Sequence, residues 1–146
     1  MAPGGMPRDL LAPAHEDYDR VRRVFNYMID RRTAAILRCA GVADVMQGVL
    51  FARTQQLPLS IHSGGHGVAG SAVCEEGLML DLSRMKGMRV NPGLRMAQAQ
   101  TGLLLGEFDH ETQAFGLATT LGLFRSPVSP ALRMGLEALS RESYGT

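Results

Sequence analysis

The residues best suited to chemistry lie in one glycine-rich segment, residues 60–70, which holds four glycines among eleven residues. Glycine tolerates positive φ, so successive backbone N–H groups can point to one side and form a concave anion site. Such a row of donors suits a diphosphate, and a ligand can approach closely where no Cβ intrudes. The alternative is an ordinary tight turn, which a Gly-Gly pair also favours.

Two histidines, His62 and His66, flank the Gly-Gly pair of this segment. A neutral imidazole is a nucleophile and a general base near neutral pH, so His66 could bond to a ligand. The alternative for His66 is a loop residue that donates a hydrogen bond. The two histidines are also spaced like a helical metal pair, but the glycines between them disfavour a helix, and we predict no metal site.

Strands and helices are expected to alternate around the glycine-rich segment. The hydrophobic pattern predicts, in order, a helix over 15–29, a strand within 33–40, a helix over 42–56, strands at 57–61, 78–82, 88–90 and 96–100, and a helix over 104–115 that Gly116 ends. This order indicates an α+β fold with a mixed sheet. Its first strand–helix–strand unit is expected to contain two parallel strands joined by a right-handed crossover.

The helix predicted over 42–56 carries one apolar stripe. The stripe consists of Val42, Val45, Met46, Val49 and Leu50. A stripe of this kind is typical of the helix face that packs on a core. Asp44 falls in the first turn, where the helix dipole favours a negative charge.

Composition and charge limit the class of protein. Of the 146 residues 45% are hydrophobic, and 15 Lys and Arg nearly balance 14 Asp and Glu, so neither nucleic acid nor an anionic membrane is expected as a partner. Residues 1–14 are rich in Gly and Pro and are expected to be a disordered lead-in without a signal peptide. There is no apolar run of the roughly 18 residues that span a membrane. With only two cysteines, we predict free thiols and a cytoplasmic protein.

An ordered set of stretches resembles the berberine-bridge-enzyme-like group of FAD-linked oxidases, which belongs to the p-cresol methylhydroxylase and vanillyl-alcohol oxidase superfamily. The matching stretches are 24–26 with 29–31, 36–40, 42–45, 63–70, 77–87 and 112–120. The resemblance implies that residues 15–122 are the N-terminal part of an FAD-binding domain of the p-cresol methylhydroxylase type. It implies that the fold is incomplete, and that catalytic residues and a small-molecule substrate belong only to a full-length protein.

In that family the glycine loop wraps the FAD diphosphate, and its last histidine bonds to the 8α-methyl group of the flavin. The resemblance implies FAD as cofactor, with His66 as candidate covalent anchor. The implied cofactor-binding residues are His62, Ser63, Gly64, Gly65, His66 and Gly67. The flavin would accept a hydride and be reoxidised by oxygen, as part of an FAD-dependent oxidoreductase. A diphosphate-binding module without redox chemistry and an inactive truncated product remain as alternatives.

The resemblance ends after Thr120. In place of the family's second glycine-rich segment, the chain has an unrelated sequence over 123–135. Codons can be chosen for 127–135 whose second reading frame encodes Gly-Ile-Ala-Gly-Leu-Thr-His-Gly, which matches the family. We therefore hypothesise that 123–146 is an unrelated tail produced by a frameshift. A disordered tail without function is the alternative.

Overall fold

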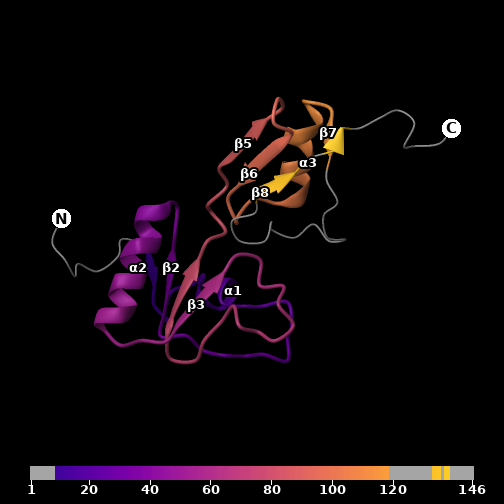
Figure 1. Ribbon diagram of the computed structural model, residues 1–146. Helices are drawn as coiled ribbons and strands as arrows, with labels where there is room; N and C mark the ends of the chain where they lie inside the picture. Colours follow the sequence, from indigo (N-terminus) through magenta and orange to yellow (C-terminus); the bar gives the residue numbers. More distant parts are fainter. Residues whose placement is uncertain (1–8, 119–132, 136, 139–146) are drawn as a thin grey trace. The chain divides into compact units, whose positions relative to one another are not determined.

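The computed structural model describes residues 9–118, 133–135 and 137–138. The chain divides into two compact units, Met1–Met85 and Lys86–Thr146 (Figure 1). Each unit combines strands with at least one helix, in agreement with the predicted α+β fold. In the described part of the chain, no helix has the length and apolar character needed to cross a membrane.

The first unit is built on a four-stranded mixed sheet with the strand order β1-β2-β4-β3. Its strands are β1 (Leu10–Leu11), β2 (Ala35–Arg38), β3 (Leu59–His62) and β4 (Leu78–Asp81). β2 and β3 both run parallel to β4, and β1 runs antiparallel to β2. The two strands of the predicted crossover are therefore parallel, but β4 lies between them.

Strand β1 falls within the lead-in that the composition predicts to be disordered. Leu10 pairs with Leu37 and Leu11 with Ile36, and Leu11 is only 3% exposed. The prediction is therefore wrong for these two residues, because their backbone pairs with β2 and their apolar side chains pack against the core clusters. Residues 1–8 of the lead-in lie outside the described residues.

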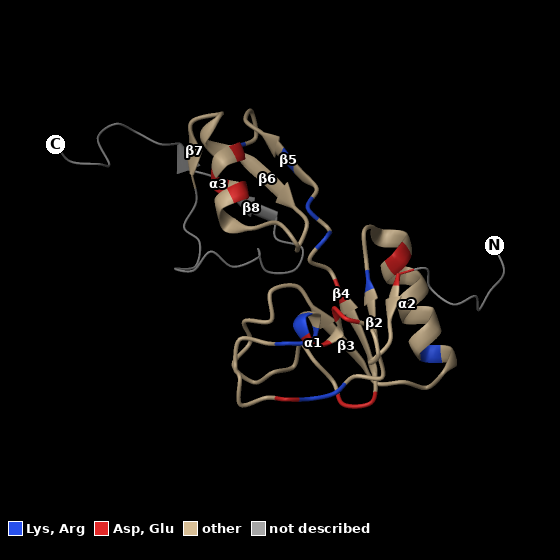
Figure 2. Cartoon of the chain, turned by 180° about the vertical axis from the view of Figure 1, so that it is seen from behind, with Lys and Arg blue, Asp and Glu red and all other residues tan. Residues whose placement is uncertain are grey.

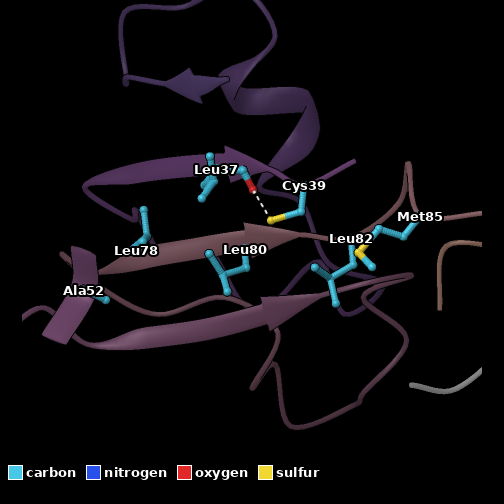
Figure 3. Close-up of a cluster of buried hydrophobic side chains, with 7 residues drawn as sticks. All are labelled: Leu37, Cys39, Ala52, Leu78, Leu80, Leu82 and Met85. Carbon is cyan, nitrogen blue, oxygen red and sulfur yellow. Dashed lines mark hydrogen bonds between the residues drawn. The ribbon is translucent and has the colours of Figure 1, made fainter. Parts of the chain in front are cut away.

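β4 is buried along its whole length because both faces of the sheet are covered. Helix α2 (Val42–Thr54) covers one face, and the segment around α1 (Tyr18–Val21) covers the other (Figure 1). Figure 3 shows the apolar cluster on the α2 face, which consists of Leu37, Cys39, Ala52, Leu78, Leu80, Leu82 and Met85. Burial raises the pKa of the Cys39 thiol to about 12, so this thiol stays protonated. Both cysteines are free, as predicted.

α2 buries a different face from the one that its apolar stripe predicts. Its buried residues are Gly48 and Ala52, whereas most of the stripe is exposed. A Cβ added at Gly48 would lie 2.5 Å from Leu80 Cδ2 and 2.8 Å from Leu37 Cδ2. The small residues let the helix backbone approach the strands closely, and the larger apolar residues are consequently turned outward.

The substitution Leu50→Ala tests which face of α2 is buried. Because Leu50 is 60% exposed, the change should alter the free energy of unfolding by no more than about 0.5 kcal/mol. Urea denaturation followed by circular dichroism measures this difference. A loss of about 2–5 kcal/mol, as expected for a buried leucine, would show that the stripe packs on the core after all.

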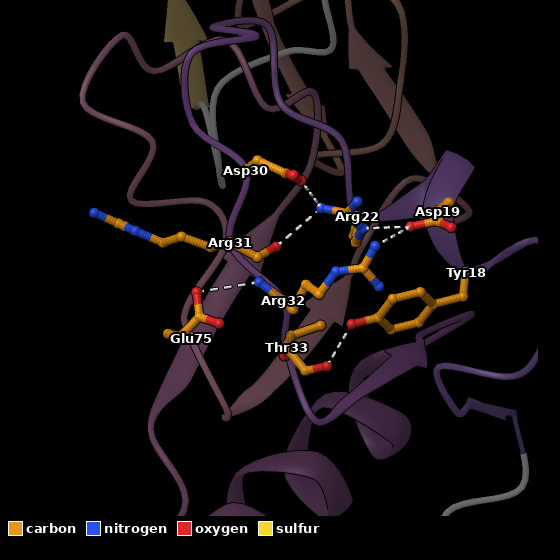
Figure 4. A network of polar contacts seen from close by, with 8 residues as sticks. All are labelled: Tyr18, Asp19, Arg22, Asp30, Arg31, Arg32, Thr33 and Glu75. Carbon is orange, nitrogen blue, oxygen red and sulfur yellow. Dashed lines mark hydrogen bonds and ion pairs between the residues drawn. The ribbon is translucent and has the colours of Figure 1, made fainter.

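The helix predicted over 15–29 is limited to α1. The segment that follows it carries four arginines, in the pairs 22–23 and 31–32, with Asp30 between them (Figure 2). The Arg22 guanidinium is buried and donates hydrogen bonds to Asp19, to Asp30 and to the carbonyl of Arg31 (Figure 4). A continuous helix could not bring Arg22 to Asp30 and Arg31, so this network replaces the helix that periodicity predicts.

The Arg22 network should make stability depend on pH in the acidic range. The hydrogen bond from Arg22 holds the pKa values of Asp19 and Asp30 below their usual range. Above pH 3.8, the pKa of these carboxyl groups in the unfolded chain, their ionised form stabilises the folded state. This stabilisation is lost as the pH falls through their lower pKa in the folded protein.

Arg22→Met should therefore lower the urea midpoint more at about pH 6 than at about pH 3. The same urea titration of both proteins at the two pH values measures the difference. An equal decrease at both pH values would show that these ion pairs do not contribute to stability.

The described residues of the second unit form a three-stranded antiparallel sheet, a pair of short strands and one helix. Its elements are β5 (Met88–Asn91), β6 (Met96–Ala99), α3 (Leu105–Gln113), β7 (Leu117–Ala118), β8 (Arg133–Gly135) and β9 (Glu137–Ala138). The sheet has the order β5-β6-β8, and β7 pairs with β9. Gly116 follows α3 with a φ of +65°, as expected for a helix stop. β8 and β9 belong to the predicted tail 123–146, the rest of which lies outside the described residues.

Candidate functional site

The glycine loop begins where β3 ends, at the carboxyl edge of the parallel strands. This edge is where open sheets with parallel strands place their ligands. His62 is the last residue of β3, and residues 63–67 continue directly into the loop. The structure therefore places all of the predicted cofactor-binding residues at one end of the sheet.

The backbone N–H groups of the loop have no acceptor in the part of the chain that the structure describes. Among the described residues, no N–H group of residues 63–69 donates a hydrogen bond, and the next one, Gly70 N–H, donates to Gly67 O at 3.0 Å. Gly65 has a φ of +64° and Gly70 a φ of +67°. These left-handed conformations favour glycine and allow neighbouring N–H groups to face the same side. The loop is thus a row of donors available to an anion.

A segment near the N-terminus, residues 24–26, packs along the loop. Phe25 N–H donates to Gly65 O at 2.9 Å, and Asn26 Nδ2 donates to Val68 O at 2.9 Å. These bonds occupy loop carbonyl groups and leave the loop N–H groups open. Hydrophobic periodicity places residues 24–26 in a helix and so misses this contact. The signal that could have indicated it is the resemblance, which matches residues 24–26 and the loop together.

The two histidines of the loop lie in different environments. The His66 side chain is exposed, and its ring centroid lies 5.9 Å from that of Phe25, with the ring planes tilted by 45°. The His62 side chain is 11% exposed and faces inward, with Nε2 3.2 Å from Arg23 O and Nδ1 4.0 Å from Asp81 Oδ1. No cluster of three or more His, Cys, Asp and Glu in the described residues could hold a metal ion. Of the two rings, only His66 is free to meet a ligand.

Comparison with known proteins identifies the family. A family model described as FAD binding domain matches residues 33–146 of the chain. The chain belongs to the FAD-binding domain family. This FAD-binding domain is 32% identical over 108 residues to an FAD-linked oxidoreductase of Dictyostelium discoideum, covering 73% of the chain and 24% of that protein. It is also 32% identical over 93 residues to berberine bridge enzyme-like 9 of Arabidopsis thaliana, covering 62% of the chain and 17% of that protein.

The fold of the domain is also similar to that of solved flavoenzymes. The crystal structure of 6-hydroxy-D-nicotine oxidase from Arthrobacter nicotinovorans matches with a TM-score of 0.75 and 28% identity, covering 80% of the chain and 26% of that protein. These similarities confirm the predicted relationship to berberine-bridge-enzyme-like FAD-linked oxidases. The FAD-binding domain spans about a quarter or less of the length of these three relatives, from 17% to 26%.

FAD is the cofactor of this family, and the loop of the FAD-binding domain fits it. The N–H groups of residues 63–69 donate to no acceptor in the described residues, so a diphosphate would find free donors there. Space is open at Gly67, where the one described atom that an added Cβ would meet within 4 Å is Ser71 Oγ, at 3.9 Å. A ligand backbone or phosphate can therefore approach the main chain there without a clash.

Proposed function

We propose that residues 63–67 hold the diphosphate of FAD. The observation that carries this proposal is the row of unused N–H groups at the carboxyl end of β3. A diphosphate needs several donors on one side, and main-chain amides supply them without the entropy loss of ordering long side chains. Ser63, Gly64, Gly65 and Gly67 provide these amides. His62 belongs to the proposed site through its position at the base of the loop.

We further propose that His66 is the covalent anchor for the flavin. Its imidazole directly follows the Gly-Gly pair in the chain, is exposed, and lies beside the Phe25 ring. A bond would form between a ring nitrogen of His66 and the 8α-carbon of the flavin. One N–H and one C–H bond would break, releasing two hydrogens with their electrons, and oxygen would take these up as hydrogen peroxide.

The whole protein is proposed to be an FAD-dependent oxidoreductase. When bound, the flavin supplies the redox chemistry, taking a hydride from a small-molecule substrate and passing electrons to oxygen. The residues of this chain bind and orient the cofactor. Substrate-binding and catalytic residues are expected outside the chain, because it spans about a quarter or less of the length of its relatives. A cytoplasmic location stays a prediction.

The proposed function is tested by loading the full chain with FAD. After acid precipitation, we expect the pellet to stay yellow and its mass to increase by one FAD less two hydrogens. Flavin that is bound but released by acid would support the diphosphate loop and contradict the covalent anchor. A folded chain that binds ADP reversibly but not FAD would instead favour a diphosphate-binding module without redox chemistry. A folded chain that binds neither would contradict the proposal.

A further inference from the structure

The His62 ring lies between the backbone carbonyl of Arg23 and the carboxyl group of Asp81. The carbonyl can only accept hydrogen bonds, and so can the carboxyl group when it is ionised. Its Nε2 is 3.2 Å from Arg23 O, and its Nδ1 is 4.0 Å from Asp81 Oδ1. Because a carbonyl oxygen accepts, Nε2 must carry the hydrogen. In the neutral ring, Nδ1 then presents a lone pair to the carboxylate. This Nδ1 is buried and has no hydrogen-bond partner among the described residues.

Asp81 is held beside the ring by its place at the end of the inner strand β4. It is 2% exposed, and its Oδ1 accepts a hydrogen bond from Ser83 N–H at 3.0 Å. The register aligns Asp81 with His62 on one side and with Arg38 of β2 on the other. Arg38 pairs with Asp17 at 3.4 Å and with no nearer carboxylate in the described residues. A buried carboxylate beside a lone pair is unfavourable, and a proton on Nδ1 would turn this repulsion into a charged hydrogen bond.

The same ring supports the glycine loop. A Cβ added at Gly65 would lie 2.8 Å from His62 Nε2, so the ring and the loop backbone are in close contact. Arg23, whose carbonyl contacts the ring, precedes the segment whose Phe25 N–H bonds to Gly65 O. The other charged or titratable groups of these packed segments, the Arg23 guanidinium and the His66 ring, are exposed. A change in the position of the His62 ring would therefore alter its packing against the backbone at Gly65.

We propose that His62 and Asp81 are a positioning pair that holds the glycine loop in shape, and that the pair closes when His62 is protonated. This proposal rests on the proposed function, because the loop held in shape is the one assigned to the FAD diphosphate. Histidine changes its charge between about pH 5 and 8. The loop is then held more firmly at the acidic end of this range, and FAD is retained more tightly there. An arginine at the same position would stay charged throughout.

Nitrogen-15 NMR of the full chain without FAD tests the pair on its own. The experiment uses a His66→Gln background, so that titration of the second loop histidine cannot contribute. We expect His62 to carry its hydrogen on Nε2 when neutral, and the Gly65 amide signal to move with pH together with the His62 ring signals. The exposed rings of His15 and His110 serve as internal references.

Two variants decide the outcome of this titration. His62→Arg should abolish the movement of the Gly65 amide, and Asp81→Asn should reduce it more than about twofold because the charged partner is lost. If Asp81→Asn does not fold, His62→Arg alone is decisive. A Gly65 movement that persists in His62→Arg would overturn the proposal, as would a neutral His62 ring with its hydrogen on Nδ1.

A second measurement connects the pair to the cofactor. In the His66→Gln background, where FAD cannot be attached covalently, the dissociation constant of FAD should rise by about threefold to tenfold between about pH 6 and pH 8, and adding His62→Arg should make it constant. If no FAD binds at any pH, the proposed function fails, while the NMR titration still decides whether the pair exists. If both proteins bind FAD with the same pH dependence, the positioning role is overturned although the proposed function stands.

Discussion

Replacing His66 with alanine is expected to remove all flavin that survives acid precipitation. The proposed bond uses a ring nitrogen of His66, and alanine offers no nucleophile. The loop amides are main-chain groups and are unchanged, so reversible FAD binding should persist. Because the ring is exposed and, within the described residues, makes only the tilted ring contact with Phe25, its loss should alter the free energy of unfolding by no more than about 0.5 kcal/mol.

Absorbance of the acid pellet and the mass of the intact chain measure this effect. His110→Ala is the matched control, since it removes another exposed histidine, on α3, outside the proposed site. The control should keep its acid-stable flavin. Acid-stable flavin in His66→Ala would show that another side chain forms the bond, and the assignment of the anchor would be wrong.

The substitution Gly65→Ala is expected to damage both the loop and cofactor binding. Gly65 has a φ of +64°, which strains any residue with a Cβ by about 1–3 kcal/mol. The added Cβ would also lie 2.8 Å from His62 Nε2 and 3.2 Å from Val24 Cα. Since a 1.4 kcal/mol change is about tenfold in binding, rearrangement of the loop should weaken FAD binding by more than tenfold.

The substitution Gly67→Ala tests FAD binding without an expected loss of stability. Gly67 is not among the glycines with positive φ, and the one described atom within 4 Å of its added Cβ would be Ser71 Oγ, at 3.9 Å. The free energy of unfolding should therefore change by no more than about 0.5 kcal/mol, while FAD binding weakens because the Cβ occupies space proposed for the diphosphate. Urea denaturation and FAD titration compare the two variants. Normal FAD binding by both would contradict the proposed diphosphate loop.

The sequence alone determined the features that depend on neighbours along the chain. The strand before the glycine loop, α3 with its stop at Gly116, and the ordered stretches of the family all follow from short patterns. Glycine spacing indicates which backbone can adopt positive φ, and this holds for Gly65 and Gly70. Secondary structure and the backbone conformation of glycine can be predicted from a short pattern, because they depend mainly on the residues within that pattern.

Only the tertiary structure decided which residues meet across the sheet. β4 lies between β2 and β3, and α2 turns Gly48 rather than its apolar stripe toward the strands. Periodicity reports which face of a helix is apolar, but burial depends on how closely the backbones approach, and here small residues allow the closest approach. The two loop histidines, only four residues apart, also differ for a tertiary reason. His62 ends β3 opposite Asp81 and is largely buried, whereas His66 lies in the loop and is exposed.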